Sequence, residues 1–216
     1  MKANQIYWIN LYKELKQNCL CLDIETCYYN GPISVIGLYK PQEGEIICQQ
    51  FIKDKNLTKE NLKQAFKGCK LLLTYNGFAL DIPKINSEFP NTIPKNIKIF
   101  DLYLFAKGLG INTNLKVLET TCGINRLKES SKRRGQTAKQ WTQYKKNNNQ
   151  NALNELLEYN KQDTINLYFL AEELIQIAEK IINNQQLPKL ISQKQKLDNF
   201  KLNPINLNKA LEKLNQ

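Results

Sequence analysis

Residues 19–26 read Cys-Leu-Cys-Leu-Asp-Ile-Glu-Thr, and the rest of the fold can be read outward from this stretch. Its length and its period of two predict a strand. Side chains two residues apart on a strand point to the same face, so Asp23 and Glu25 lie on one face together with Cys21. Neighbouring carboxylates raise each other's pKa unless a cation joins them. The pair is therefore either a solvated strand end or part of a cation site.

The chain after this strand alternates between predicted strands and helices. Strands are predicted at 33–40, 45–52, 70–75 and 97–101, and helices at about 57–68, about 80–89 and 151–182. The turn at 41–44, Pro-Gln-Glu-Gly, favours a hairpin between the first two of these strands. Three antiparallel strands, a helix, a strand, a helix, a strand and then helices is the element order of the RNase H-like fold. We therefore expect an α/β protein with a five-stranded mixed sheet, three antiparallel strands followed by two parallel ones, flanked by helices.

The length of 216 residues suits one domain with some chain left over. We expect a lead-in helix within residues 1–18, the main domain over 19–182 and a C-terminal extension over 183–216. The extension is rich in Gln, Lys and Asn and contains two prolines, which favours a segment outside the core.

Composition narrows the classes of partner and of metal site. The chain has 31 Lys and Arg against 20 Asp and Glu, a net charge of +11, which favours nucleic acid or an anionic membrane face. A·T-biased coding would also produce such a chain rich in Lys, Asn and Ile. It has six Cys without a Cys-x-x-Cys motif and no His, so a metal site would have to use oxygen ligands. With no secretion signal and no apolar run of ~20 residues, we expect a cytoplasmic protein with reduced, mostly buried thiols and no membrane partner.

Two further acids follow other predicted elements. Asp81 lies five residues past Asn76, where a turn leaves a strand for a helix, and an Asp at such a place is usually a helix cap. Asp163 lies on the apolar stripe of the helix at 151–182, where an acid needs a partner or a metal. Tyr159 is one helical turn earlier on the same face, and taken alone it is a core aromatic.

Together these residues resemble a known set of motifs. Asp23-Ile24-Glu25-Thr26, Asn76-Gly77-Phe78-Ala79-Leu80-Asp81 and Tyr159-x-x-x-Asp163 resemble, in this order, the three exonuclease motifs of the DEDD superfamily. The tyrosine indicates the DEDDy branch, and the absence of His excludes the branch with a histidine base. The text Tyr75-Asn76-Gly77-Phe78 to Asp81-Ile82-Pro83, with Glu158-Tyr159-Asn160 later, is similar to YprB-like exonucleases of the RNase H-like superfamily. The resemblance covers about residues 19–180.

The resemblance implies a metal site and roles for its neighbours. Two divalent ions, Mg²⁺ or Mn²⁺, would be held by four metal ligands, Asp23, Glu25, Asp81 and Asp163. Tyr159 would complete the catalytic set by orienting the attacking water, because a phenol with an ordinary pKa of ~10 is a poor base. Thr26 and Asn76, beside the motifs, would contact the terminal nucleotide or fix the loop.

A basic run lies between the predicted helices. It comprises Arg126, Lys128, Lys132, Arg133, Arg134 and Lys139. Cations close to Trp141 and Tyr144 suit a single strand, because cations track phosphates and rings stack on bases. We therefore expect Arg126, Lys132, Arg133 and Arg134 to bind substrate, although a solvated surface helix has the same composition.

The leading hypothesis is a metal-dependent 3′–5′ exonuclease that hydrolyses phosphodiester bonds at single-stranded DNA or RNA ends by a two-metal mechanism, with its polarity taken from the resemblance. One alternative is an RNase H-like endonuclease, which also uses clustered acids. Another is a nucleic-acid-binding module that has lost catalysis. The sequence names no protein partner.

Overall fold

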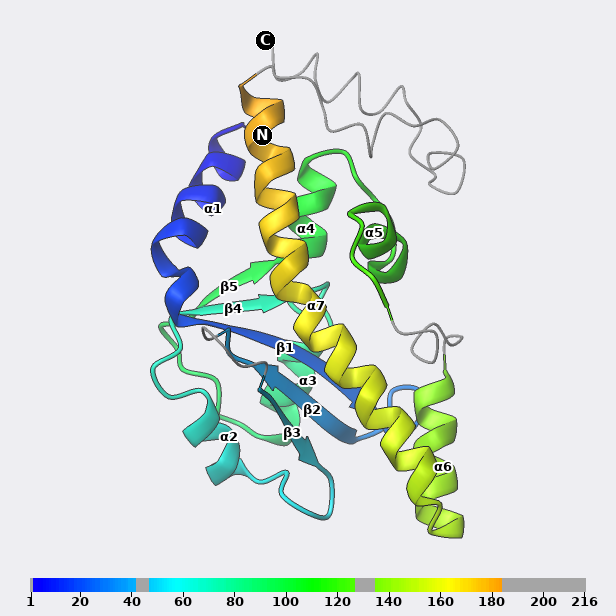
Figure 1. Cartoon of the computed structure of the whole chain (residues 1–216). Helices are drawn as coiled ribbons and strands as arrows, with labels where there is room; N and C mark the ends of the chain where they lie inside the picture. Colours follow the sequence, from blue (N-terminus) through cyan, green and yellow to red (C-terminus); the bar gives the residue numbers. More distant parts are fainter. Residues whose placement is uncertain (1, 42–46, 127–134, 184–216) are drawn as a thin grey trace.

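A computed structural model describes residues 2–41, 47–126 and 135–183 of the protein (Figure 1). The strands are β1 (Cys19–Thr26), β2 (Ile33–Tyr39), β3 (Cys48–Ile52), β4 (Leu71–Thr74) and β5 (Lys98–Asp101). They form one five-stranded sheet in the order β3-β2-β1-β4-β5. β1 pairs antiparallel with β2, and β2 with β3, whereas β4 is parallel to β1 and β5 parallel to β4. The mixed sheet expected from the sequence is confirmed.

Helices cover both faces of this sheet. They are α1 (Lys2–Leu15), α2 (Lys59–Ala65), α3 (Asp81–Glu88), α4 (Leu102–Gly108), α5 (Leu115–Thr121), α6 (Gln136–Asn147) and α7 (Gln150–Ile182), with a short 3₁₀ helix at Lys16–Asn18. Residues of α2 and α3 pack on one face, and residues of α1, α4 and α7 on the other. Within the described ranges, no helix combines the length and the apolar character needed to cross a membrane.

The side chains of β1 point alternately to the two faces of the sheet, and this alternation decides which face carries Asp23 and Glu25. Cys19 and Cys21 belong to the apolar core under α7, while Leu20 and Leu22 belong to the core under α2 and α3. Asp23 and Glu25 lie on the same face of β1 as Cys19 and Cys21, because side chains two residues apart on a strand share a face. Both acids therefore point to the side of the sheet that α7 covers. All six cysteines are free thiols.

Helix α7 crosses the middle of the sheet (Figure 1). A glycine of β2 lies at this crossing. Gly37 of β2 pairs with Asp23 of β1. A Cβ atom built on Gly37 would lie 2.3 Å from Oγ1 of Thr164 and 2.5 Å from Oδ1 of Asn160, both on α7. Such distances are too short for any real contact, so the helix can lie this close only because the position has no side chain. This close approach holds α7 directly over the acids of β1.

We expect Gly37→Ala to destabilise the protein by about 1–3 kcal/mol, because the added methyl group overpacks a rigid contact between helix and sheet. Urea denaturation measures the change. Gly31→Ala is the matched control, since the three atoms nearest to a Cβ there all belong to the side chain of Tyr28, which is 62% exposed and has solvent to move into. Equal stability of the two variants would contradict the close approach.

Candidate active site

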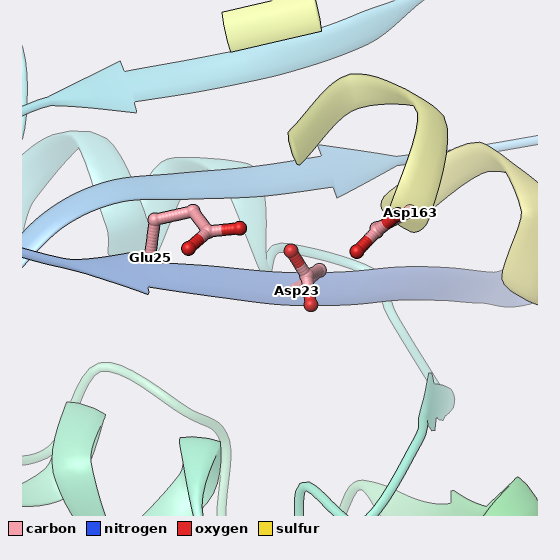
Figure 2. A group of neighbouring side chains, drawn as sticks. All are labelled: Asp23, Glu25 and Asp163. Carbon is pink, nitrogen blue, oxygen red and sulfur yellow. The ribbon is translucent and has the colours of Figure 1, made fainter. Parts of the chain in front are cut away.

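Three carboxylates from two distant parts of the chain meet above the sheet. Asp23 and Glu25 project from β1, and Asp163 projects from α7 (Figure 2). One oxygen from each lies within 4.8 Å of the others. Asp163 is buried, and the other two are half-buried. A set made only of carboxylate oxygens fits a hard divalent cation such as Mg²⁺ or Mn²⁺.

The acids raise one another's pKa. Burial raises the pKa of Asp23 well above its usual range, and the charges of Asp163, Glu25 and Asp81 add to the rise. Burial also raises the pKa of Glu25 to about 8, although a hydrogen bond with Thr137 on α6 lowers this pKa. In Asp163, burial again raises the pKa, and the guanidinium of Arg126 opposes it. A cation bound between these groups would relieve the repulsion, so the electrostatics also fit a metal site.

Asn160 of α7 fixes the position of Asp23. Its Nδ2 donates to Oδ2 of Asp23 at 2.9 Å and to the backbone oxygen of Asp23 at 3.2 Å. Its Oδ1 accepts from Nε2 of Gln50 on β3 at 3.0 Å. Asn160 is fully buried, so these bonds also satisfy an amide that would otherwise be costly to bury. The carboxylate of Asp23 is therefore oriented by a helix and two strands.

Asp81 lies beside the three acids but does not join their group. It is the first residue of α3 rather than its N-cap, which is Leu80. The hydroxyl of Thr74 donates to its Oδ2 at 3.1 Å. Burial raises the pKa of Asp81 to about 7, and Thr74 opposes the rise. The structure thus brings together three of the four predicted metal ligands and places the fourth close enough to raise the pKa of Asp23.

The loop before Asp81 is held by Asp101 at the end of β5. Its carboxylate accepts from the backbone N–H of Asn76 at 2.8 Å and of Phe78 at 3.0 Å. It also caps α4 by accepting from the N–H groups of Tyr103 and Leu104. Asp101 is therefore both a helix cap and the anchor of the loop that carries Asn76.

An open pocket of about 720 Å³ lies against Asp163. Its lining includes Asn76, Lys116, Tyr159 and Asp163. The ammonium of Lys116 lies over the ring of Tyr159, 4.6 Å from its centre. Burial and the nearby acids raise the pKa of the Tyr159 hydroxyl, so this hydroxyl keeps its proton at neutral pH. The volume is within the range of small-molecule sites.

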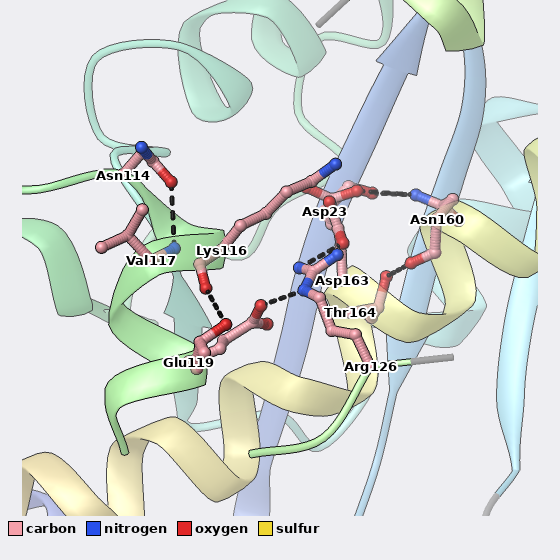
Figure 3. A network of polar contacts seen from close by, with 10 residues as sticks. Asp23, Asn114, Lys116, Val117, Glu119, Arg126, Asn160, Asp163 and Thr164 are labelled. Carbon is pink, nitrogen blue, oxygen red and sulfur yellow. Dashed lines mark hydrogen bonds and ion pairs between the residues drawn. The ribbon is translucent and has the colours of Figure 1, made fainter. Parts of the chain in front are cut away.

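The remaining predicted substrate residues are placed very differently from one another. Thr26 is half-buried at the end of β1, opposite Ile33. The side chain of Arg126 is only 7% exposed and forms ion pairs with Glu119 and Asp163 (Figure 3), so it is not part of an exposed basic face. Lys132, Arg133 and Arg134 lie outside the described residues.

The expectation that Trp141 stacks on bases is wrong. Trp141 is 5% exposed and packs with Cys27, Val35 and Leu153 in a small core between α6, α7 and the sheet. The apolar ring faces this core because α6 lies along α7. Tyr144 is half-buried beside it, with the ammonium of Lys55 5.3 Å from its ring centre.

Sequence reasoning missed three residues that shape the site. Asn160 and Glu119 are buried polar residues within otherwise apolar helix faces, and this pattern was available as a signal. Lys116 carried no comparable signal, because its neighbours in space come from α7, far away in the sequence.

We expect Glu25→Gln to stabilise the metal-free protein at alkaline pH. The folded-state pKa of about 8 lies above the ordinary value of 4.5, so the folded protein holds a proton that the unfolded chain releases between these values. The stability from this group is complete below about pH 4.5 and is lost as the pH rises through about 8. The gain from the substitution should be near zero at about pH 5 and reach about 1–3 kcal/mol at about pH 9.

Thermal unfolding in the presence of a chelator measures this gain. Asp54→Asn is the control, because the side chain of Asp54 is 55% exposed and its charge is screened by water. A gain from Glu25→Gln that does not vary with pH would show that the charge of Glu25 is already compensated in the metal-free protein.

Comparison with protein families agrees with this geometry. A model of the RNase_H superfamily matches residues 20–175. The match includes β1 from its second residue, the other four strands and most of α7, and so contains Asp23, Glu25, Asp81 and Asp163. No curated protein matches the chain. Because the matched residues make up well over half of the chain, and the sheet has the expected order and pairing, the protein belongs to the RNase H superfamily.

Proposed function

We propose that this protein is a nuclease of the DEDDy type, a 3′–5′ exonuclease that removes nucleotides from single-stranded DNA or RNA ends. The observation that carries the proposal is the meeting of Asp23 and Glu25 with Asp163, one turn after Tyr159, at the edge of an open pocket. Superfamily membership supports nuclease chemistry, and the motif order supports the DEDDy type. The direction of digestion rests on the resemblance of the motifs.

Asp23, Glu25 and Asp163 would hold divalent ions, with Asp81 as a further ligand from the neighbouring loop. When bound, Mg²⁺ or Mn²⁺ supplies charge stabilisation for the reacting phosphate and lowers the pKa of a water molecule. The protein contributes rigidity, because β1 and α7 hold the carboxylates and Asn160 orients Asp23.

Tyr159 is suited to orienting a water molecule rather than to deprotonating it. Its hydroxyl keeps its proton, so it can donate one hydrogen bond and accept another. The ring is held under the ammonium of Lys116, which limits its rotation. A fixed hydroxyl one turn from Asp163 would place a water on one side of a phosphate at the metal ligands.

The surroundings of the pocket suit an unpaired end. Phe78 and Leu80 follow Asn76 in the loop beside the acids, and these residues are 62% and 59% exposed. Tyr28 and Tyr29, just after the strand that carries Asp23 and Glu25, are 62% and 84% exposed. Exposed rings near a phosphate site bind single strands by stacking on bases, whatever the base. We assign the stacking to the exposed rings of Phe78, Tyr28 and Tyr29, because Trp141 is buried.

Single-stranded DNA and RNA oligonucleotides with a 5′ label test the proposal. In Mg²⁺ or Mn²⁺ the wild type should shorten them from the 3′ end, and a blocked 3′ end should resist. Asp23→Ala and Asp163→Ala should lower the rate by at least about 100-fold, because each removes a ligand of the reacting centre. Asp54→Asn, at an exposed position, is the control that should keep full activity.

Two outcomes favour the alternatives. Cleavage of circular single strands would identify an endonuclease. Binding of oligonucleotides without turnover in any divalent metal would identify a binding module. Equal rates for the wild type, Asp23→Ala and Asp163→Ala would remove the assignment of the acids.

We expect Tyr159→Phe to lower kcat by about 10- to 100-fold and to leave KM nearly unchanged. The substitution keeps the ring and its contact with Lys116 and removes only the hydroxyl. Single-turnover digestion under saturating enzyme separates the chemical step from binding. An unchanged rate would mean that Tyr159 has only a packing role.

A further inference from the structure

The guanidinium of Arg126 lies against the candidate metal ligands. Its Nη2 is 2.6 Å from Oδ1 of Asp163, and its Nε is bonded to Oε2 of Glu119 (Figure 3). The three side chains are 7%, 9% and 0% exposed for Arg126, Asp163 and Glu119. A positive charge of the protein itself thus lies at the carboxylate that a metal would need.

The two contacts of Arg126 use different nitrogens of the guanidinium. Glu119 accepts a hydrogen bond from Nε, so it already neutralises the buried guanidinium. Asp163 contacts a different nitrogen, with Oδ1 2.6 Å from Nη2. Because Glu119 holds Nε and Asp163 contacts Nη2, Arg126 would stay paired with Glu119 if Asp163 turned to another cation.

We propose that Arg126 is an internal counter-ion that competes with the divalent metal for Asp163 and that Glu119 retains it when the metal binds. The proposal rests on the function proposed above, because it needs Asp163 to be a metal ligand. Arg126 is then a positioning residue that acts through Asp163. The pair of Arg126 and Glu119 sets how tightly the site binds metal.

Charge balance gives the two buried residues opposite effects. Removing Glu119 leaves Arg126 as an uncompensated cation beside the site, which repels a divalent ion and holds Asp163 more firmly. Removing Arg126 alone would leave Glu119 buried without a partner and could unfold the protein. Replacing both residues removes the competitor without leaving Glu119 buried and unpaired, so that only Asp163 loses its counter-ion.

Calorimetric titration with Mn²⁺, without nucleic acid, tests the proposal. We expect the double variant Arg126→Met with Glu119→Gln to bind Mn²⁺ about tenfold more tightly than the wild type, and Glu119→Gln alone to bind it about tenfold more weakly. The matched control carries the same substitutions at an exposed ion pair, Lys13→Met with Glu179→Gln. This control should leave the Mn²⁺ affinity unchanged.

Thermal unfolding provides a second measurement on the same proteins. With a chelator, the double variant should melt below the wild type, because Asp163 loses its counter-ion, and saturating Mn²⁺ should raise its melting temperature by more than it raises that of the wild type. Equal Mn²⁺ affinity in the wild type and the double variant would overturn the role of Arg126 and leave the nuclease proposal intact. No Mn²⁺ binding by the wild type would overturn both.

Discussion

The close approach of α7 to the middle of the sheet is the constraint on which the candidate site depends. It exists because Gly37 presents no side chain to Asn160 and Thr164. The same two residues also position the site. The side chain of Asn160 donates a hydrogen bond to Asp23, and the hydroxyl of Thr164 donates one to the backbone oxygen of Asn160. A helix held further from the sheet would leave Asp163 too far from Asp23 and Glu25 to share a cation. The packing of α7 on the sheet therefore also determines the geometry of the acids.

Most of the fold could be predicted from the pattern of strands and helices, because the periodicity of each element is visible within a short stretch of sequence. The alternation of residues 19–26 placed Asp23 and Glu25 on one face, and the element order placed β4 and β5 parallel to β1. The contacts across the site were not predictable in this way. The burial of Arg126 and of Trp141 depends on which side of each segment meets α7, and spacing within the segment does not decide this. Their residue types suggested a nucleic-acid surface, whereas their surroundings make them interior groups.

The loop from Tyr75 to Leu80 shows how a short segment can be made rigid without a core of its own. Asn76 has a φ of 59°, and a Cβ on Gly77 would lie 1.8 Å from Oγ1 of Thr74. The loop therefore folds back tightly onto β4, and its N–H groups need a nearby acceptor. Asp101 provides this acceptor from the end of the next parallel strand. Parallel strands that end at one edge of the sheet thus supply both the loop and the group that holds it.

A folded protein with several acids in one place must tolerate their repulsion when no cation is bound. Here each acid has a donor or a cation from another element. Asn160 of α7 serves Asp23, Thr74 of β4 serves Asp81, and Thr137 of α6 acts on Glu25. Asp163, the most buried of the group, faces the guanidinium of Arg126. Neutral donors need little reorganisation when a metal binds, whereas Asp163 must turn away from a guanidinium that Glu119 holds in place. Asp163 and the ion pair that faces it therefore affect both the stability of the metal-free protein and its affinity for metal.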